Sequence, residues 1–419
     1  MRGAKPLLPG LAETGFNAAR LPGPEQALIA FFTRARLAAP QIERVGLSCA
    51  LHRVLAEPVA ADADYPAGAR STMDGFAVDS RATPGRLALS GEVRMGSAPS
   101  EALAPGSAWR IPTGGMLPAG ADAVVPIEDA RIDGASVVVE RAVDPGGCVA
   151  PRGSDMRAGE ALIECGRIIG AAELGVLATL GIVEVPVFRR PLFGVFSSGD
   201  ELVDAAKATD LGQIRDSNSW AIGAALEGLG ARARLYPILR DDEAAMERAL
   251  RGALCDCDGL VLTGGSSVGE RDLTPQVLAR LGAPGVIVHG IRVKPGKPTV
   301  LAATGGKPAI GLPGNPASAL IILEAVAAPI IAALLGALVP APVFEATLSA
   351  DIEKRAGWTW IVPVEREAGS IPVVHPLPMR SSHVSLLARA HGYLLLGEEV
   401  AKVGAGERVS VVAFRTARR

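Results

Sequence analysis

The sequence predicts a multidomain α/β plus β fold. It comprises a central doubly wound, mostly parallel sheet domain, a β-rich insertion domain, a helical/β N-terminal domain and a C-terminal β-barrel. The chain has 419 residues, 49% of them hydrophobic and 21% charged, which is enough for several separate cores. Apolar strands alternate with helical stretches across residues 191–340. Short apolar runs broken by Gly and Pro fill residues 62–145 and 341–419, a texture typical of small β domains.

We expect residues 1–61 and 146–190 to form an elongated N-terminal domain. Its first helix is predicted to open at Pro24, which suits the first helical position, and Ser48 is a candidate N-cap for a second helix. A helix (AAELGVLATLG) and a strand (IVEVPVF) follow in the later segment. Because the first helices have no strands beside them, they are expected to pack with that segment. Residues 62–145 would then be an inserted β domain.

Residues 191–340 are predicted to form the α/β domain, since strands this apolar suit a parallel sheet covered on both faces. An apolar run from Ala317 to Val339 is long enough to cross a bilayer. However, Glu324 and Pro329 interrupt it and no basic cluster follows it. A helix that covers the sheet is therefore favoured over a membrane span. The expected strands are PLFGVF, ARLYPIL, DGLVLT, VIVHGIRV and PAIGL.

Charge and cysteine content argue against several classes of protein. Lys+Arg total 42 and Asp+Glu 44, so the net charge of -2 gives no reason to expect nucleic acid or an anionic membrane as partner. Any anion-binding site must be local. The five cysteines are too scattered for a disulfide framework, and Cys255 and Cys257 have no nearby histidine to complete a zinc site. Reduced thiols and an N-terminus without an apolar signal run predict a cytoplasmic protein.

Acidic and basic side chains follow the predicted strands, where ligands bind in open parallel sheets. Taken alone, an acid after a strand is often a helix N-cap, and KPGKP is a basic turn. All of these loops fall on one edge of the sheet, so the carboxylates and lysines are expected to meet there. Such a set suits Mg²⁺ together with a phosphorylated or oxyanionic ligand. The residues are Asp200, Glu201, Asp241, Asp242, Glu270, Asp272, Lys294 and Lys297.

The backbone of two loops at this edge also favours anions. A glycine pair after DGLVLT permits positive φ angles, so that consecutive amides can form an anion nest. Pro316 suits the first position of the long helix with Asn315 as its N-cap, which turns the positive end of the helix toward the cleft. The predicted anion-binding positions, besides the two lysines, are Ser198, Gly264, Gly265, Ser266, Pro313, Asn315 and Pro316.

Other patterns are weaker. GSSVG places Ser267 in a GxSxG pattern, the nucleophile elbow of α/β-hydrolases, but no oxyanion motif of the HGGG type lies upstream. GLGARA resembles a dinucleotide fingerprint but ends a predicted helix instead of opening one. The sequence has no Walker A motif, and its five histidines lack metal-ligand spacing. Hydrolase and dinucleotide chemistry are therefore not favoured.

Seven motifs in order carry a family resemblance, and they lie between residues 71 and 316. On these motifs the chain resembles the MoeA family of molybdopterin molybdenumtransferases and the related C-terminal region of gephyrin. The resemblance extends from about residue 24 to the end of the chain and is loosest in the C-terminal domain. The motifs are STMDGFAV, IPTGGMLPAGADAVVPIED, RGSDMRAGE, SSGDELV, GGSSVGERD, KPGKP and GLPGNP.

The resemblance implies a homodimer that inserts molybdate into adenylylated molybdopterin in the α/β cleft, with Mg²⁺-dependent release of AMP. It implies that Asp74 and Thr113 of the second subunit close the cleft, that Lys294 and Lys297 bind the anions, and that Asp155 matches a further functional position. Small molecules, and other molybdenum cofactor enzymes, are the expected partners. The implied catalytic residues are Asp74, Thr113, Glu201, Asp241, Asp242 and Asp272, and the implied metal ligands are Asp200, Glu201 and Asp272.

Two other functions remain as alternatives. The first is adenylyl transfer onto molybdopterin by the same α/β module. The β insertion and the C-terminal barrel argue against it, because stand-alone adenylyltransferases resemble the central domain only. The second is a non-catalytic scaffold of the gephyrin type, which would not need the acids and lysines at the sheet edge.

Overall fold

The computed structural model describes residues 21–264, 273–337, 339–367, 369, 372–378 and 382–415. The chain divides into two compact units. The larger contains the residues up to Ala56, Gly166–Gly170 and everything from Glu184 onward, and the smaller contains Glu57–Cys165 and Ala171–Val183. The four domain boundaries expected from the sequence stay a prediction.

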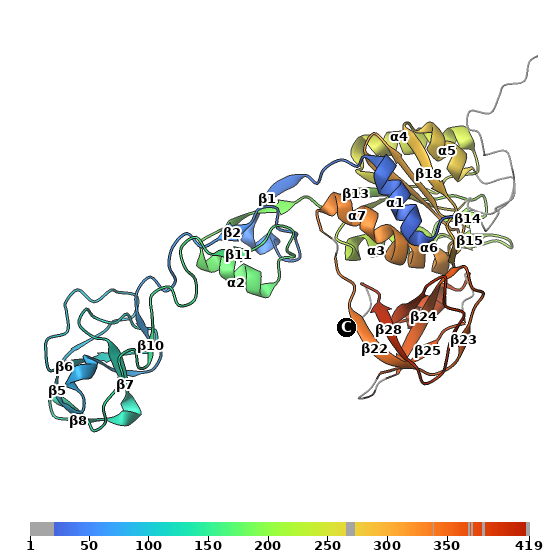
Figure 1. The fold of residues 1–419 in the computed structure, drawn as a ribbon. Helices are drawn as coiled ribbons and strands as arrows, with labels where there is room; N and C mark the ends of the chain where they lie inside the picture. Colours follow the sequence, from blue (N-terminus) through green and yellow to red (C-terminus); the bar gives the residue numbers. More distant parts are fainter. Residues whose placement is uncertain are drawn as a thin grey trace, which may run out of the picture. The chain divides into compact units, whose positions relative to one another are not determined.

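The larger unit contains a six-stranded sheet that is mostly parallel, as predicted (Figure 1). β20 is antiparallel to both of its neighbours, β21 and β18, so β18 points the same way as the remaining strands. The carboxyl ends of all strands except β20 therefore share one edge. β20 was not expected from the sequence. In sheet order the strands are β16 (Arg232–Leu235), β13 (Leu192–Ser197), β17 (Gly259–Thr263), β21 (Lys307–Leu312), β20 (Val300–Thr304) and β18 (Pro284–His289).

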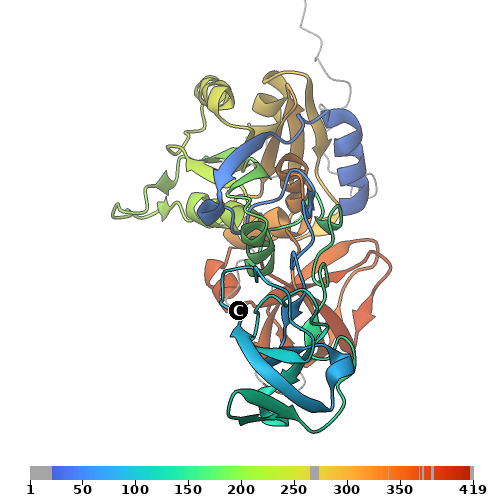
Figure 2. The same ribbon diagram turned by 90° about the vertical axis from the view of Figure 1, so that its left-hand side faces the viewer.

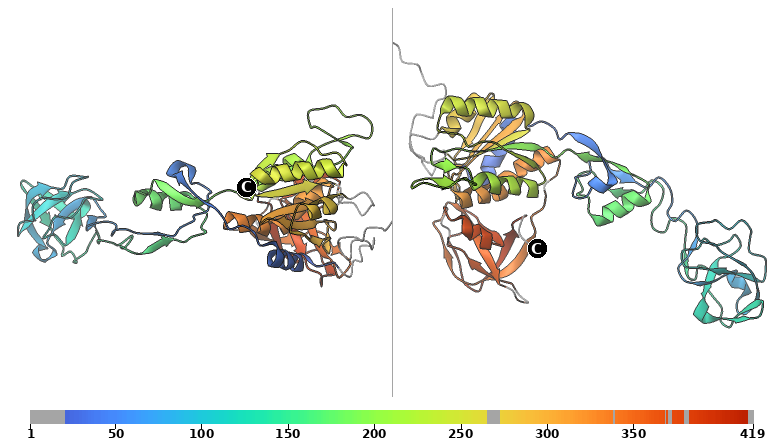
Figure 3. Two further views of the ribbon diagram at one scale, coloured as in Figure 1. Left: turned by 90° about the horizontal axis from the view of Figure 1, so that it is seen from above. Right: turned by 180° about the vertical axis from the view of Figure 1, so that it is seen from behind.

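Helices cover both faces of this sheet, which makes it doubly wound (Figure 3). Ile222 and Ile331 belong to the core on one face, and Met246 and Leu278 to the core on the other. On the first face lie α1 (Pro24–Ala35), α3 (Asn218–Gly228), α6 (Pro316–Ile322), the π-helical turn η5 (Leu323–Ala327) and α7 (Ala328–Leu335). On the second lie α4 (Glu243–Asp256) and α5 (Thr274–Arg280).

The long apolar segment forms a continuous helix from Pro316 to Leu335. Its length and composition alone would allow it to cross a membrane, but 72% of its most apolar window is buried inside the protein. Ile322 and Ile331 lie in the core shared with the sheet. The prediction of a sheet-covering helix is confirmed.

Two predictions about the N-terminal segment are wrong. Phe31 of α1 lies in the same core as Val288 of β18, so α1 packs on the central sheet and not on residues 146–190 (Figure 2). The helix expected after Ser48 is only a 3₁₀ turn, because His52 has a φ of 62° and its N–H donates to a distant carbonyl, that of Ile169 (2.8 Å). The strands of this segment are β1 (Ile42–Gly46) and β12 (Glu184–Phe188), which pair antiparallel.

The C-terminal strands close into a barrel, as predicted, because β24 pairs with both β25 and β26. Tyr393 and Phe414 of this region share a core with Ile322 of α6. The strands are β22 (Val343–Leu348), β24 (Thr359–Glu367), β25 (Val373–Pro376), β26 (Gly392–Leu396) and β28 (Arg408–Ala413), with β19 (Val293–Lys294) added beside β24. Smaller elements are β23 (Ile352–Glu353), β27 (Lys402–Val403), the helix α8 (Val384–Arg389) and the pair β14 (Leu202–Val203) and β15 (Ile214–Arg215).

The smaller unit has a six-stranded sheet of its own, and Phe76 is fully buried in its core. In sheet order the strands are β7 (Ala123–Pro126), β4 (Gly75–Val78), β6 (Ser107–Ile111), β5 (Gly85–Glu92), β9 (Ser136–Val139) and β8 (Ala130–Asp133). Two ribbons, β3 (Arg70–Ser71) with β10 (Val149–Ala150) and β2 (Val59–Ala60) with β11 (Ala161–Ile163), and the helix α2 (Ala171–Thr179) complete the unit. The prediction of a helix at α2 is confirmed.

Candidate functional site

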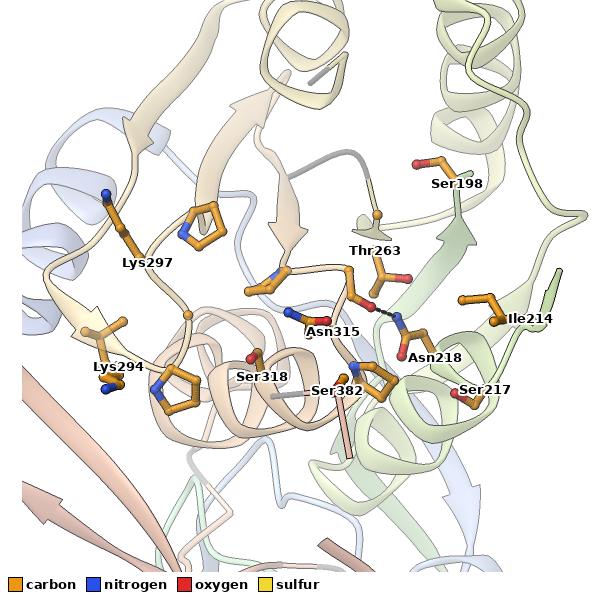
Figure 4. Close-up of a pocket in the computed structure, with 18 of the residues that line it drawn as sticks. Ser198, Ile214, Ser217, Asn218, Thr263, Lys294, Lys297, Asn315, Ser318 and Ser382 are labelled. Atoms are coloured by element: carbon orange, nitrogen blue, oxygen red, sulfur yellow. Dashed lines mark hydrogen bonds between the residues drawn. The ribbon is translucent and has the colours of Figure 1, made fainter. Parts of the chain in front are cut away.

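A pocket of about 1170 Å³ opens at the carboxyl edge of the central sheet (Figure 4). The loops that follow β13, β17, β18 and β21 line it, together with the segment before α3 and residues of the C-terminal barrel. A position outside the carboxyl ends of the strands is where open α/β sheets bind ligands.

Close backbone packing holds three of these loops together. Gly264, after β17, has a φ of 105°, and a Cβ at this position would collide with the Ser198 carbonyl. A Cβ on Gly314 would lie 3.4 Å from the Gly264 Cα. The N–H of Ser198 donates to the carbonyl of Thr263 (2.8 Å). Glycine at position 264 is therefore required where the loops after β13, β17 and β21 meet.

Four basic side chains border the pocket: Arg215, Lys294, Lys297 and Arg355. The two lysines lie on the same side of it (Figure 4). Lys294 is exposed, and its Nζ lies 4.3 Å from the centroid of the Trp360 ring. Cations grouped in this way create a local positive field that attracts an anion, although the chain as a whole is almost neutral.

Hydrogen-bond acceptors stand on the other side, where Figure 4 shows Asn218. Asp216 is 6% exposed, and its Oδ1 accepts from Ser197 Oγ (2.8 Å) and from the Ser219 N–H (3.1 Å). Asn218 donates through Nδ2 to the Gly314 carbonyl (2.8 Å). Its Oδ1 is buried and accepts no hydrogen bond from the described part of the chain. A buried acceptor at a pocket wall suits an N–H donor on a ligand.

The predicted acidic residues of the larger unit are placed differently from one another. Glu201 lines the pocket, whereas Asp200, Asp241 and Asp242 do not. The N–H of Asp241 lies 3.4 Å from Asp200 Oδ1. Asp242 is the N-cap of α4, where its carboxylate accepts from the Ala245 N–H (2.8 Å), a common structural role for an acid after a strand. The catalytic and metal-binding roles assigned to these residues stay predictions.

Of the predicted substrate- and anion-binding residues that the structure describes, all except Asp155 line the pocket. Asn315 occupies the N-cap position of α6 and Pro316 begins the helix, as expected, although the Asn315 side chain makes no capping hydrogen bond. The lining set is Ser198, Gly264, Lys294, Lys297, Pro313, Asn315 and Pro316. The predicted positions Gly265, Ser266, Ser267, Glu270 and Asp272 lie outside the described residues.

Asp74 and Thr113 of the smaller unit form a local pair. Asp74 Oδ1 accepts from the Thr113 N–H (2.6 Å) and from Thr113 Oγ1 (2.9 Å). The backbone hydrogen bond is the largest cause that lowers the pKa of Asp74, and the hydroxyl bond adds to it. Asp74 is therefore ionised at neutral pH. Asp155, in the same unit, is exposed, and its N–H donates to the Tyr65 carbonyl (3.1 Å).

Several pocket residues were not predicted from the sequence. Asp216 and Asn218 belong to a polar run at the start of α3, a helix-start signal that could have drawn attention to them. The barrel residues reach the pocket through the pairing of β19 with β24, which no local pattern reveals. The polar and aromatic pocket residues that were not predicted include Asp216, Asn218, Ser318, Arg355, Trp360 and Ser382.

Within the residues that the structure describes, no group of three or more His, Cys, Asp or Glu side chains is arranged to hold a metal ion. The carboxylates that border the pocket there are Glu201 and Asp216. Carboxylate oxygens are the ligands that Mg²⁺ prefers, and Mg²⁺ commonly takes only one or two of them together with substrate oxygens. The donor set therefore fits Mg²⁺ in its chemistry.

Family comparison first defines the class of protein. The family model described as "Probable molybdopterin binding domain" matches residues 194–333, which include most of the central sheet and of the pocket lining. The fold is thus a multidomain α/β one with a central domain of the molybdopterin-binding type. The models "MoeA N-terminal region (domain I and II)" and "MoeA C-terminal region (domain IV)" match residues 24–181 and 345–414. The chain belongs to the MoeA family.

Relatives match over nearly the whole chain. The molybdopterin molybdenumtransferase of Haemophilus influenzae is 33% identical over 387 residues, which are 89% of this chain and 94% of the relative. The protein of the same name from Bacillus subtilis is 32% identical over 90% of both chains. The crystal structure of a molybdopterin biosynthesis MoeA protein from Pyrococcus horikosii matches with a TM-score of 0.82 and 32% identity, covering 94% of this chain and 99% of that chain. The family resemblance inferred from the motifs is confirmed.

Proposed function

We propose that this protein is a molybdopterin molybdenumtransferase, which inserts molybdate into adenylylated molybdopterin and releases AMP. Relatives that carry this name align with the chain over most of its length. The observation that carries the proposal is one pocket with two lysines on one side and, on the other, the acceptor Asn218 together with Asp216 from the same segment. Such a pocket suits a ligand with anionic groups at one end and a heterocycle bearing N–H groups at the other.

The lysines bring two anions together. Molybdate and a phosphorylated pterin repel each other, and Lys294 and Lys297 offset that repulsion by binding oxygens of both. Arg355, Ser318 and Ser382 add hydrogen-bond donors to the lining of the pocket. On the opposite side, Asn218 Oδ1 and Asp216 would accept N–H groups of the ring system and fix its orientation.

Glu201 would hold Mg²⁺ together with substrate oxygens, and the charge of the metal would stabilise the departing AMP. Asp200, which does not line the pocket, and Asp272, which lies outside the described residues, stay predicted ligands. In a homodimer, Asp74 and Thr113 of the second subunit would close the pocket, as the family resemblance implies. Because hydrogen bonds from Thr113 lower the pKa of Asp74, this carboxylate is ionised at neutral pH and would not supply a proton. Cytoplasmic location and contact with other molybdenum cofactor enzymes are part of the same proposal.

The proposal is tested by incubating the purified protein with adenylylated molybdopterin and Mg²⁺, with and without molybdate, and by measuring AMP. We expect AMP release that depends on molybdate, and chelation with EDTA should suppress it. Lys297→Ala should lower the rate at least tenfold, because it removes a charge at the oxyanion side. Lys402→Ala is the matched control, since Lys402 pairs with Asp351 and Glu353 on the barrel and does not line the pocket.

Other outcomes would identify the alternatives. Incorporation of AMP from ATP into molybdopterin would show adenylyl transfer. No turnover by a folded protein, with cellular function unaffected by Lys297→Ala, would favour a scaffold. Either result would contradict the proposed reaction.

A further inference from the structure

The position of Lys294 depends on the C-terminal barrel. We propose that Trp360 is a positioning residue that holds the Lys294 ammonium at the mouth of the α/β pocket, so that the barrel controls anion binding. The proposal rests on the proposed function in one respect, namely that Lys294 binds an oxyanion. The contact between Lys294 and Trp360 lies within one compact unit and does not depend on the proposed function.

Strand pairing brings the two residues together. β19 pairs in parallel with β24, and Lys294 is in register with Trp360. Register partners on neighbouring strands extend to the same face of a sheet, so their side chains are neighbours. The Thr359 N–H also donates to the Arg292 carbonyl (3.2 Å), which extends this pairing to the residue before β19.

An ion pair fixes the start of the lysine loop to the barrel. Arg292 donates through Nε to Glu398 Oε1 (3.1 Å) and through a terminal nitrogen to Oε2 (2.7 Å). Both side chains are partly buried. A bidentate arginine–carboxylate pair restricts orientation as well as distance, so the backbone just ahead of Lys294 is held by the barrel.

The turn after Lys294 is fixed on the α/β side. Gly296 has a φ of 111°, and a Cβ there would collide with Ile322 of α6. Thr299 Oγ1 donates to the Gly296 carbonyl (2.6 Å), and the Ile291 N–H donates to the Lys297 carbonyl (2.9 Å). The backbone is therefore held on both sides, and the conformation of the long Lys294 side chain is the main freedom left.

The Trp360 ring removes that freedom without removing the charge. Lys294 is exposed, and no carboxylate of the described residues forms an ion pair with it. A lysine side chain has many rotamers to lose when it is ordered, and tryptophan is the best aromatic partner for an ammonium. A carboxylate partner would compete with the anionic ligand. A ring face leaves the N–H donors of the ammonium available to it.

The experiment compares Trp360→Leu, which removes the ring, with Trp360→Phe, which keeps an aromatic face. We expect Trp360→Leu to weaken molybdate binding, measured by calorimetry, about two- to fivefold, and Trp360→Phe to weaken it less than about twofold. KM for molybdate should rise while kcat changes little. In a Lys294→Gln background, Trp360→Leu should cause no further loss. Equal effects of Trp360→Leu with and without Lys294 would overturn the proposal.

A second measurement needs no substrate. The rate of acetylation of Lys294 by acetic anhydride, followed by mass spectrometry, should rise in Trp360→Leu, whereas that of Lys297 should not. Phe344→Leu is the matched control, because it removes the ring under Arg366 (5.3 Å to the centroid) elsewhere on the barrel. It should change neither labelling nor binding. If the wild-type protein fails to bind molybdate, the proposed function is contradicted. The rate of Lys294 acetylation in Trp360→Leu, compared with the wild type, still tests the role of Trp360. An unchanged rate would overturn this inference.

Discussion

Hydrogen bonds from Thr113 are the main cause of the lowered pKa of Asp74, and the charge of Arg110 adds to it. The N–H and hydroxyl of Thr113 both donate to the same carboxylate oxygen, and both bonds lower the pKa of Asp74. A carboxyl with a lowered pKa in the folded state adds stability above its unfolded pKa, and that stability is lost as the pH falls through the folded value. Because Asp74 is exposed, the pair matters for proton chemistry more than for stability.

Thr113→Val should raise the pKa of Asp74 part of the way toward its ordinary value. The substitution removes the hydroxyl donor but leaves the backbone N–H, which is the larger cause of the shift. The measurement is a ¹³C-NMR titration of the aspartate carboxyl groups in the intact protein. Asp79, whose pKa is lowered mainly by its side-chain hydrogen bond with Arg81, is the internal control and should not move. A pKa of Asp74 unchanged by Thr113→Val would contradict the assigned cause.

Single residues were predictable where charge follows an apolar strand. Lys294, Lys297 and Glu201 were identified in this way, and the structure places all three at the pocket. The same reasoning did not separate Asp242 from them, because a capping acid and a ligand-binding acid occupy the same place in sequence. Asp216 was missed because its burial depends on Ser197, a residue of another strand.

The long helix contains one irregular turn, η5, and this turn carries a buried charge. Glu324 Oε2 accepts from Arg415 (2.9 Å), while Glu324 Oε1 is buried without a hydrogen bond from the described residues. Burial raises the pKa of Glu324, and Arg415 opposes that rise. Burial also raises the pKa of the nearby Tyr393 to about 12. A buried ion pair between Glu324 and Arg415 thus links the helix to the end of the barrel.

Arg415→Met should destabilise the larger unit by about 3–5 kcal/mol at pH 8, because it leaves a buried carboxylate without its partner. The pKa of Glu324 is raised in the folded protein, and this determines how stability depends on pH. The stability that Glu324 contributes is fully present below its unfolded pKa and is lost as the pH rises through its folded pKa. The loss should therefore be smaller at pH 5, as measured by urea unfolding. The double variant Glu324→Gln/Arg415→Met should depend less on pH. Equal losses at both pH values would show that Glu324 is not the titrating group.

At the scale of elements, periodic segments were predictable and context-dependent ones were not. The apolar strands and the long helix follow from pattern alone. β20 was not predicted because it is antiparallel to its neighbours β18 and β21, and no helix separates it from them in the sequence. The helix expected after Ser48 is absent because its backbone is paired with residues more than a hundred positions away.

At the scale of the whole molecule, the two units have separate cores, so a substitution can be assigned to one of them. Phe76→Ala should destabilise the smaller unit by about 3–5 kcal/mol, since Phe76 is fully buried in a core made only of that unit's residues. Molybdate binding by the pocket should survive. Phe193→Ala, in the core of the larger unit, is the counterpart and should lower molybdate affinity. Calorimetry with and without molybdate measures both, and destabilisation of the larger unit by Phe76→Ala would contradict this division.

The sequence predicted the order of folded regions but not their association. The central sheet, the β-rich insertion and the C-terminal barrel were predictable as classes of structure, because the spacing of apolar residues is a local property. The core that Tyr393 and Phe414 share with Ile322, and the strand that joins the lysine loop to the barrel, depend on contacts between distant segments. For that reason the contribution of the barrel to the pocket emerged only from the structure.

The Glu324–Arg415 ion pair also determines which truncated or tagged versions of the protein keep this contact. Arg415 lies just after β28, and residues that follow the last strand of a domain are often removed when affinity tags are fused to a chain. A version shortened after Phe414 would keep the acid in the helix and lose its counter-ion. Truncations and fusions should therefore leave Arg415 in place.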